Sequence, residues 1–311
     1  MTRSFRSALA LAPAAWLAGC AMSSPSPSPA PSAASSSAPT AELMKWPDLL
    51  GRQRPEPTAS ITYGEHQLQR VDVWVPAGPG PHPTVLMVHG GCWQTEIADR
   101  RIMNWVADDL RRRGMAVWNI DYRGVDREGG GYPGTFLDAA AAADALRTHA
   151  AAYKLDITPL VATGHSAGGH LALWLAARPR LPAASPLRTA DPIRIDSVVS
   201  LGGLPDLEEA ARPPGSGCGT EVVARLTGGR FEDTSVPRLG PLGVDQVLIN
   251  GMQDRIIPTA YAEGYAAPMR AKGDKVRVRM IDRTGHVELI APETAAWAAT
   301  VEEIERALGR R

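Results

Sequence analysis

The chain has 311 residues, and its 33 basic residues equal its 33 acidic residues in number. Apolar residues make up 44% and charged residues 21% of the sequence, an ordinary mixture for a globular protein. Without a net field, neither nucleic acid nor an anionic surface is an expected partner. The sequence has no CxxC pair and no HExxH motif, so no metal site and no cofactor are expected.

The first residues have the pattern of an export signal. Two arginines precede the apolar stretch 7–18, which is too short to span a bilayer as a stable helix. The stretch ends in Leu-Ala-Gly-Cys, which resembles the lipobox of bacterial lipoproteins. The resemblance implies removal of residues 1–19, lipidation of Cys20 and a lipid-anchored location in the bacterial cell envelope, on the periplasmic side of the outer membrane. A plain secretory signal and an uncleaved anchor are the alternatives.

A tether is expected after the signal. Residues 21–40 are rich in Ser, Pro and Ala, and they carry no charge and no large apolar side chain beyond Met22. Such a segment cannot bury enough surface to fold. We therefore expect residues 20–45 to form an extended tether and residues 46–311 to form one domain.

Strands and helices alternate through this domain. An early hairpin is expected at 61–63 and 71–75, and buried apolar runs predict strands that are covered on both faces. Helical spacing and alanine-rich composition predict the helices between them. The expected later strands are 84–88, 115–122, 160–163, 197–201, 244–250 and 276–281, and the expected helices are 103–113, 136–153, 167–177, 261–272 and 294–308. This order predicts an α/β fold with a mostly parallel, doubly wound sheet of about eight strands, helices on both faces and no large lid domain.

The motif Gly-His-Ser-Ala-Gly at 164–168 lies between a predicted strand and a predicted helix. That context is the one that the G-x-S-x-G nucleophile elbow requires. The serine occupies a strained turn, and side chains in place of Gly164 and Gly168 would collide with the neighbouring strand and helix. Ser166 is therefore the candidate nucleophile, and a mere glycine-rich turn is the alternative.

A second motif, His-Gly-Gly-Cys-Trp at 89–93, directly follows the predicted strand 84–88. This is the position of the loop that donates an N–H to the oxyanion of acyl transfer. The expected donors are the N–H groups of Gly91, Cys92 and Ala167. His89 is expected to brace the loop by hydrogen bonding. Trp93 is a candidate substrate-pocket wall, with a core tryptophan as the alternative.

The base and the acid must come late in the chain, because this fold uses the order Ser, Asp, His. Among the seven histidines, His286 is the one in a loop after the last predicted strand. Asp254 follows the strand before it, and Asp206, after the strand 197–201, is the second candidate. The sequence therefore predicts a triad of Ser166, Asp254 and His286, in which the carboxylate orients the imidazole that activates the hydroxyl.

These motifs resemble the esterase/lipase branch of the α/β-hydrolases that carries HGGxW and GHSAGG, and within it they are similar to arylformamidases of the kynurenine formamidase type. The resemblance runs from about residue 70 to about residue 308 and implies a serine hydrolase with an acyl-enzyme intermediate. Cys92 stands where a tyrosine is common, and an export signal does not suit the cytosolic breakdown of tryptophan. We therefore expect a carboxylesterase for small to medium acyl groups.

Two other functions stay open at this point. An arylformamidase-like amidase would share the machinery and act on a different leaving group. A non-catalytic cell-envelope binding protein would keep the scaffold without the reaction. The expected partners are a small-molecule ester or amide and, through the lipid anchor, a membrane.

Cys92 and Cys218 are the cysteines that remain after the expected processing. An exported protein meets oxidising conditions, and Cys218 lies in a Gly-rich loop that could fold over the edge of the site. The hypothesis is a disulfide that pins the oxyanion loop to this loop, and two free buried thiols are the alternative.

Overall fold

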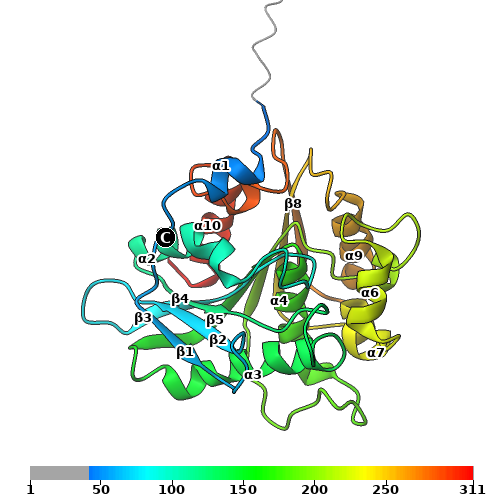
Figure 1. Cartoon of the computed structure of the whole chain (residues 1–311), viewed down its shortest axis with the longest axis horizontal. Coiled ribbons are helices and arrows are strands. Elements are labelled where there is room, and N and C mark those ends of the chain that lie inside the picture. Colours follow the sequence, from blue (N-terminus) through cyan, green and yellow to red (C-terminus); the bar gives the residue numbers. More distant parts are fainter. Residues whose placement is uncertain (1–41, 311) are drawn as a thin grey trace, which may run out of the picture. The chain divides into compact units, whose positions relative to one another are not determined.

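The computed structural model describes residues 42–310, which form an eight-stranded sheet in the order β1-β2-β4-β3-β5-β6-β7-β8 (Figure 1). β1 pairs with β2 and β2 pairs with β4 in antiparallel fashion, whereas the other neighbours are parallel. The strands are β1 (Ala59–Thr62), β2 (Arg70–Trp74), β3 (His82–Val88), β4 (Ala116–Ile120), β5 (Leu155–His165), β6 (Ser197–Leu201), β7 (Asp245–Gly251) and β8 (Val276–Ile281). The predicted mostly parallel sheet is confirmed, and the architecture is that of the α/β-hydrolase fold.

Helices follow most of the strands. The longer ones are α2 (Asn104–Arg112), α3 (Gly134–His149), α4 (Ala167–Ala177), α6 (Thr220–Thr227), α9 (Ala260–Ala271) and α10 (Ala295–Ala307). The shorter ones are α1 (Trp46–Leu50), α5 (Leu207–Ala210), α7 (Phe231–Thr234) and α8 (Val236–Leu239), with 3₁₀ turns η1 (Arg100–Met103), η2 (Arg178–Arg180) and η3 (Glu288–Ile290).

Two apolar cores lie on opposite faces of the sheet, because successive side chains of a strand point to opposite sides. Along β3, Leu86 and Val88 belong to one core, which also contains buried residues of α3, α4 and α9. Val85 and Met87 belong to the other core, with buried residues of α2 and α10. The expected double winding is therefore present, and the carboxyl ends of the parallel strands bring the loops after β3, β5, β7 and β8 to one edge.

The chain between β6 and β7 contains α5, α6, α7 and α8, which the sequence analysis left unassigned. Three of these helices have four residues and α6 has eight, so none is long enough to show a clear helical period in the sequence. Figure 1 shows this region packed beside α4 and α9. The Gly/Pro-rich loop with Cys218 lies between α5 and α6.

The described range begins close to α1. The expected signal 1–19, Cys20 and residues 20–41 of the expected tether lie outside this range. Within it, the N–H of Met44 already donates to the carboxylate of Glu288, so this residue contacts the domain. No helix between residues 42 and 310 has the length and apolar character needed to cross a bilayer.

Candidate active site

Ser166 stands at the sharp turn between β5 and α4. Its φ of 55° and ψ of −121° lie in a region that residues with a side chain rarely occupy. Two backbone hydrogen bonds of 2.8 Å fix the turn: the Ser166 N–H donates to the Leu201 carbonyl, and the Ser166 carbonyl accepts from the Gly169 N–H. The motif thus has the strand-turn-helix context of a nucleophile elbow.

The glycines of this turn are required by close backbone approach. A Cβ at Gly164 would lie 2.1 Å from the carbonyl oxygen of Gly168, and a Cβ at Gly168 would lie 2.2 Å from a carbonyl oxygen of β3. A Cβ at Gly90 would lie 3.1 Å from the Cβ of Ser166. The expected collision at positions 164 and 168 is therefore confirmed, and the loop after β3 directly contacts the elbow.

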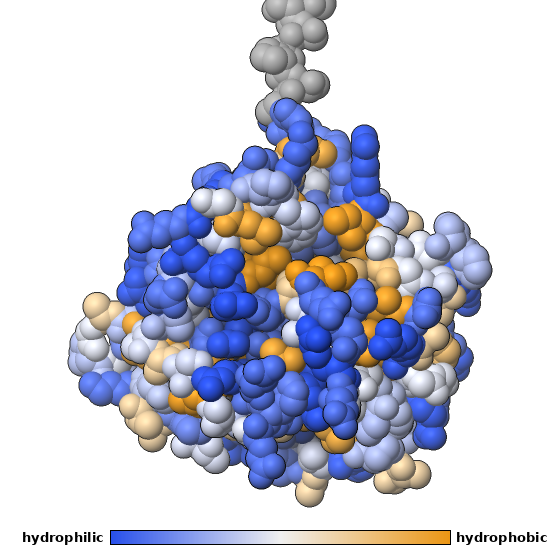
Figure 2. Space-filling view, in the orientation of Figure 1, coloured by the Kyte–Doolittle hydropathy of each residue, from blue (hydrophilic) through white to orange (hydrophobic). Residues whose placement is uncertain are grey.

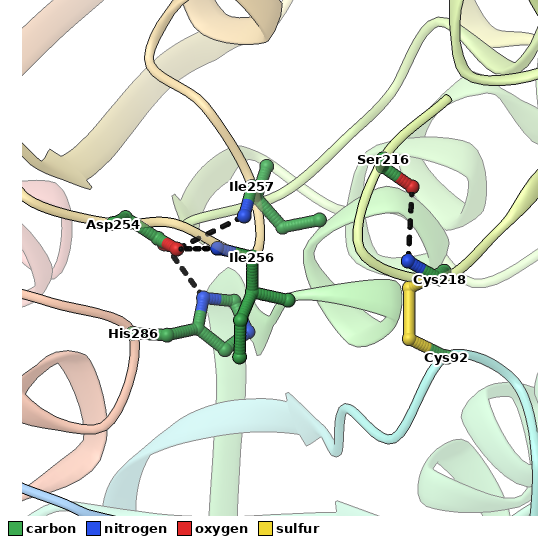
Figure 3. Close-up of a disulfide and its surroundings, with 7 residues drawn as sticks. All are labelled: Cys92, Ser216, Cys218, Asp254, Ile256, Ile257 and His286. Atoms are coloured by element: carbon green, nitrogen blue, oxygen red, sulfur yellow. Dashed lines mark hydrogen bonds and ion pairs between the residues drawn. A yellow bond between two sulfur atoms is a disulfide. The ribbon is translucent and has the colours of Figure 1, made fainter. Parts of the chain in front are cut away.

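His286 follows β8, and Asp254 follows β7. The His286 Nδ1 and the Asp254 Oδ2 are 2.6 Å apart, and each residue is 7% exposed. The Asp254 Oδ1 accepts from the N–H groups of Ile256 at 2.8 Å and Ile257 at 2.9 Å, as Figure 3 shows. These bonds fix the carboxylate, which in turn holds Nδ1 of the imidazole and leaves Nε2 for a proton transfer.

Asp206, the second candidate for the acid, has a different role. Its side chain accepts from the N–H groups of Glu208 at 3.0 Å and Glu209 at 3.1 Å, so it caps the N-terminus of α5. The carboxylate that contacts His286 is that of Asp254.

The three predicted oxyanion residues lie around the elbow. Gly91 and Cys92 have φ values of 99° and 51°, and both line a cavity whose wall also contains Ser166 and His286. Ala167 is the first residue of α4, so its N–H has no acceptor within the helix. The loop after β3 and the start of α4 thus meet at the elbow, and both could offer N–H groups to an oxyanion.

His89 braces the loop, as predicted. Its Nδ1 is 2.7 Å from the Gly90 carbonyl oxygen, and its Nε2 is 2.9 Å from the Oδ1 of Asp121. The ring stacks on Tyr122 with centroids 4.3 Å apart, and the Tyr122 hydroxyl donates to the His89 carbonyl at 3.0 Å. The Asp121 carboxylate also accepts from Arg100 at 2.9 Å, so the loop is tied to the sheet and to η1.

Cys92 and Cys218 form a disulfide with sulfur atoms 2.05 Å apart, which links the oxyanion loop to the loop between α5 and α6 (Figure 3). The neighbouring Gly217 donates its N–H to the Ile256 carbonyl at 2.8 Å. A Cβ at Gly217 would lie 2.8 Å from that same oxygen. The loop of Cys218 therefore contacts both the oxyanion loop and the loop that presents Asp254.

Trp93 does not line the cavity of Ser166, which corrects its expected role as a substrate-binding residue. The side chain is fully buried in the core below the loop, with its ring 5.5 Å from that of His170. The chain reverses at Cys92 and Trp93, which both have positive φ. The reversal leaves Cys92 in the cavity wall and places the indole in the core.

Two residues that the sequence analysis did not single out lie beside His286. The rings of His165 and His286 are 4.3 Å apart, and the His165 Nε2 is 3.0 Å from the His286 carbonyl oxygen. Burial, and secondarily the neighbouring His286, hold the pKa of His165 well below its ordinary 6.5, so its ring is neutral near pH 7. Trp46 lies edge-on to both histidines, with ring centroids 6.2 and 6.3 Å away. Trp46 is the first aromatic residue after the Ser/Pro/Ala-rich segment, and this position was only a weak sequence signal that it lies beside the histidines.

A family model described as BD-FAE matches residues 71–237, which is more than half of the chain. This chain belongs to the BD-FAE family. The matched range contains the oxyanion loop, the elbow and Cys218, whereas Asp254 and His286 come from the part of the domain that follows it.

The chain is also similar to the probable carboxylic ester hydrolase LipM of Mycobacterium tuberculosis, with 23% identity over 222 residues. The alignment covers 68% of this chain and 51% of LipM, so the chain spans about half the length of this curated relative. Among solved structures, a truncated carbohydrate esterase from gut microbiota has a TM-score of 0.67 at 19% identity and covers 82% of this chain and 98% of its own. Esterase 2 of Thermogutta terrifontis, phosphonylated by sarin, has a TM-score of 0.67 at 19% identity over 85% of this chain and 97% of its own. At such identities the structural similarity establishes the fold.

Proposed function

We propose that this member of the BD-FAE family is a serine carboxylesterase that cleaves esters of small to medium acyl groups through an acyl-enzyme. The observation that carries the proposal is the 2.6 Å contact between His286 and Asp254, with His286 in the wall of the cavity that also contains Ser166. A histidine held by a buried carboxylate beside a strained serine is the arrangement that general-base activation of a hydroxyl requires.

In the proposed reaction, the Nε2 of His286 takes the hydroxyl proton of Ser166 as the oxygen attacks the ester carbonyl. Asp254 keeps the imidazole in the correct tautomer and stabilises the imidazolium. The N–H groups of Gly91, Cys92 and Ala167 stabilise the negative charge on the carbonyl oxygen. When the C–O bond breaks, His286 gives its proton to the departing alcohol. Water then attacks the acyl-enzyme by the same steps and releases the acid.

The direct test is Ser166→Ala. The substitution should lower ester turnover by a factor on the order of 10⁴ or more, because the nucleophile is lost while the oxyanion donors remain. A fluorophosphonate probe should label the wild-type protein at Ser166 and leave the variant unlabelled. Esterase 2 of T. terrifontis, to which the chain is similar, is itself phosphonylated by sarin, which makes this class of probe a suitable choice. Undiminished turnover by the variant would overturn the triad, and an absence of both turnover and labelling in the wild type would favour the binding-protein alternative.

Esters and amides are distinguished by the leaving group. We expect kcat/KM for aryl esters to exceed that for N-formyl aryl amides, measured on the same preparation with Ser166→Ala as the blank. Structures of the T. terrifontis esterase are described with propionate and with butyrate, so propionyl and butyryl esters are suitable first substrates. Faster cleavage of the formamides would replace the esterase proposal by the arylformamidase-like alternative.

We also propose that the protein acts at the bacterial cell envelope, held by lipid on Cys20. The support is the lipobox-like sequence that ends at Cys20 and the uncharged Ser/Pro/Ala-rich segment that follows it. The test is to fractionate cells that express the full chain or its Cys20→Ala variant. The full chain should sediment with the outer membrane and incorporate labelled palmitate, and equal behaviour of the two proteins would contradict the anchor.

A further inference from the structure

The cavity at Ser166 has an apolar lining. It has a volume of about 290 Å³, and Figure 2 shows hydrophobic residues gathered around a hollow on this face of the molecule. Apart from Ser166, two histidines and the disulfide-bonded Cys92, its lining side chains are Trp46, Leu50, Ile97, Ala98, Ile102 and Ile256. Among residues 42–310, no carboxylate, amide, lysine or arginine side chain contributes to this wall. A bound group would therefore find, in the described part of the chain, no carboxylate, lysine or arginine side chain of this wall with which to pair a charge.

One wall of the cavity is α1, which precedes the sheet and lies outside the range matched by the family model. The carboxylate of Glu288 fixes its N-terminal side: it accepts from the N–H of Met44 just before α1 and, at 3.0 Å, from the N–H of Gly285 in the loop of His286. The start of α1 and the loop of the proposed base therefore share one anchor.

The C-terminal side of α1 is also fixed. Leu49 is fully buried in the core that contains α2 and α10. Beyond the helix, Arg52 forms an ion pair with Glu293, and the Trp105 Nε1 donates to the Gln53 carbonyl at 3.1 Å. These contacts make α1 a fixed wall of the cavity, with Trp46 facing the two histidines and Leu50 43% exposed.

We infer that α1 and the segment 97–102 form the acyl-binding wall, and that the substrates carry a neutral, apolar acyl group. The inference rests on the proposed function and narrows its substrate class. The acyl group becomes bonded to Ser166 in the first half-reaction and is released from it in the second, so the space beside Ser166 must hold it in both. A carboxylate against this wall would lose hydration with no lysine or arginine of the described residues to pair with, whereas each methylene gains from leaving water.

The first test compares acyl groups on one 4-nitrophenyl leaving group. From acetyl to hexanoyl, kcat/KM should rise by up to about fourfold for each buried methylene. The succinyl half-ester, which carries a carboxylate where the butyryl ester has its methyl group, should react on the order of 100-fold more slowly than the butyryl ester. A flat chain-length series, or equal rates for the succinyl and butyryl esters, would overturn the inference.

A matched pair of variants tests the wall itself. Leu50 and Leu137 are both exposed leucines, at 43% and 40%, but Leu137 lies on α3 and does not line the cavity. Leu50→Glu should lower the ratio of hexanoyl to acetyl kcat/KM by about tenfold, since it places a charge beside the acyl chain, and Leu137→Glu should leave that ratio as in the wild type. The same ratio for both variants would overturn the assignment of α1 to the acyl wall.

Trp46 supplies a second measurement that does not depend on an introduced charge. Trp46→Ala should lower the hexanoyl to acetyl ratio, and Trp46→Phe should restore most of it, because a phenyl ring recovers most of the apolar surface. A purely structural role would lower both esters equally and would contradict the inference.

Labelling of Ser166 separates the two proposals. If the probe labels Ser166 and acetyl esters are cleaved, but the variants do not change the hexanoyl to acetyl ratio of kcat/KM, the assignment of the acyl wall is wrong. The esterase proposal is then unaffected. If Ser166→Ala retains full activity, the proposed function is wrong, and the assignment of the acyl wall, which depends on it, is wrong as well.

Discussion

The two sides of the cavity at Ser166 are held in place by different kinds of interaction. On the side of His286, the geometry depends on short polar contacts around Asp254, which accepts from the imidazole and from two backbone N–H groups. On the oxyanion side, the loop after β3 is held by the Cys92–Cys218 disulfide, by the contact of His89 with Asp121, and by stacking on Tyr122.

The difference predicts where each side is vulnerable. On the side of His286, the direction of the hydrogen bond between Asp254 and Nδ1 decides whether Nε2 can accept a proton. The exchange of one carboxylate oxygen of Asp254 for an amide nitrogen should therefore lower turnover strongly and change the free energy of unfolding little. The oxyanion loop draws on several supports, one of them covalent and long-range in sequence. Loss of the disulfide should therefore lower the free energy of unfolding as well as turnover.

Asp254→Asn should have the largest effect. The amide can present its NH₂ group to Nδ1, which favours the wrong tautomer, and kcat should fall on the order of 10⁴-fold with little change in the free energy of unfolding. Asp206→Asn is the matched control, because asparagine also caps a helix and Asp206 does not contact His286. Similar losses of kcat in the two variants would contradict the assignment of the acid.

Removal of the disulfide should come second. The bridge closes a segment of 126 residues, and loss of such a constraint from the unfolded chain should lower the free energy of unfolding by about 4 kcal/mol in Cys92→Ala/Cys218→Ala. The value of kcat should fall as well, since the oxyanion donors shift while the His286–Asp254 contact stays. Denaturant unfolding with and without dithiothreitol checks this: reductant should destabilise the wild type and leave the double variant unchanged. A double variant with the free energy of unfolding and the kcat of the wild type would contradict the proposed difference between the two sides of the cavity.

The side of His286 could be predicted from the sequence because its signals are local. Ser166 lies at the turn after β5, and Asp254 and His286 lie in the loops after β7 and β8. Parallel strands bring their carboxyl ends to one edge of the sheet. The glycines at 164 and 168 mark a turn in which a Cβ would strike backbone atoms. Position relative to strands therefore predicted that His286 contacts Asp254 and lies in one cavity with Ser166, without knowledge of any long-range contact.

The apolar wall of the cavity could not be predicted from the sequence in this way. Trp46 meets the histidines because α1 is fixed by long-range contacts, among them that of Met44 with Glu288, more than two hundred residues later. For Trp93, an aromatic residue after glycines gives the same sequence signal whether it lines a pocket or enters the core. The positive φ at Cys92 and Trp93, which decides between the two, depends on tertiary contacts. The short helices α5, α7 and α8 likewise carry too few residues to show a period.

A histidine of the core, His170, supports the elbow helix α4. His170 in α4 is fully buried, its Nε2 is 2.9 Å from the Thr234 carbonyl oxygen, and burial lowers its pKa to about 4 from the ordinary 6.5. Below pH 6.5 the unfolded chain therefore binds a proton that the folded protein does not bind until about pH 4, so this residue destabilises the fold as the pH falls through that window. Its contribution should amount to about 2 kcal/mol between pH 7 and pH 5. Urea unfolding of the wild type and of His170→Gln at both pH values should show a smaller drop for the variant, and equal drops would contradict the assigned shift.

The smallest expected effect belongs to His165, which acts on the catalytic side through the backbone. His165→Leu removes the donor to the His286 carbonyl, so one anchor of the loop is lost while the contact of Asp254 with His286 remains. One such hydrogen bond is worth about 1 kcal/mol, which corresponds to a fall in kcat by a factor of about five to ten. Because the pKa of His165 lies well below its ordinary value, the ring is already neutral where the enzyme works, and the acid limb of the kcat/KM profile should keep its midpoint. A shifted midpoint would mean that His165 carries charge during turnover. A loss as large as that of Asp254→Asn would show that the imidazole is held by its loop instead of by its carboxylate, and the two sides of the cavity would then be alike.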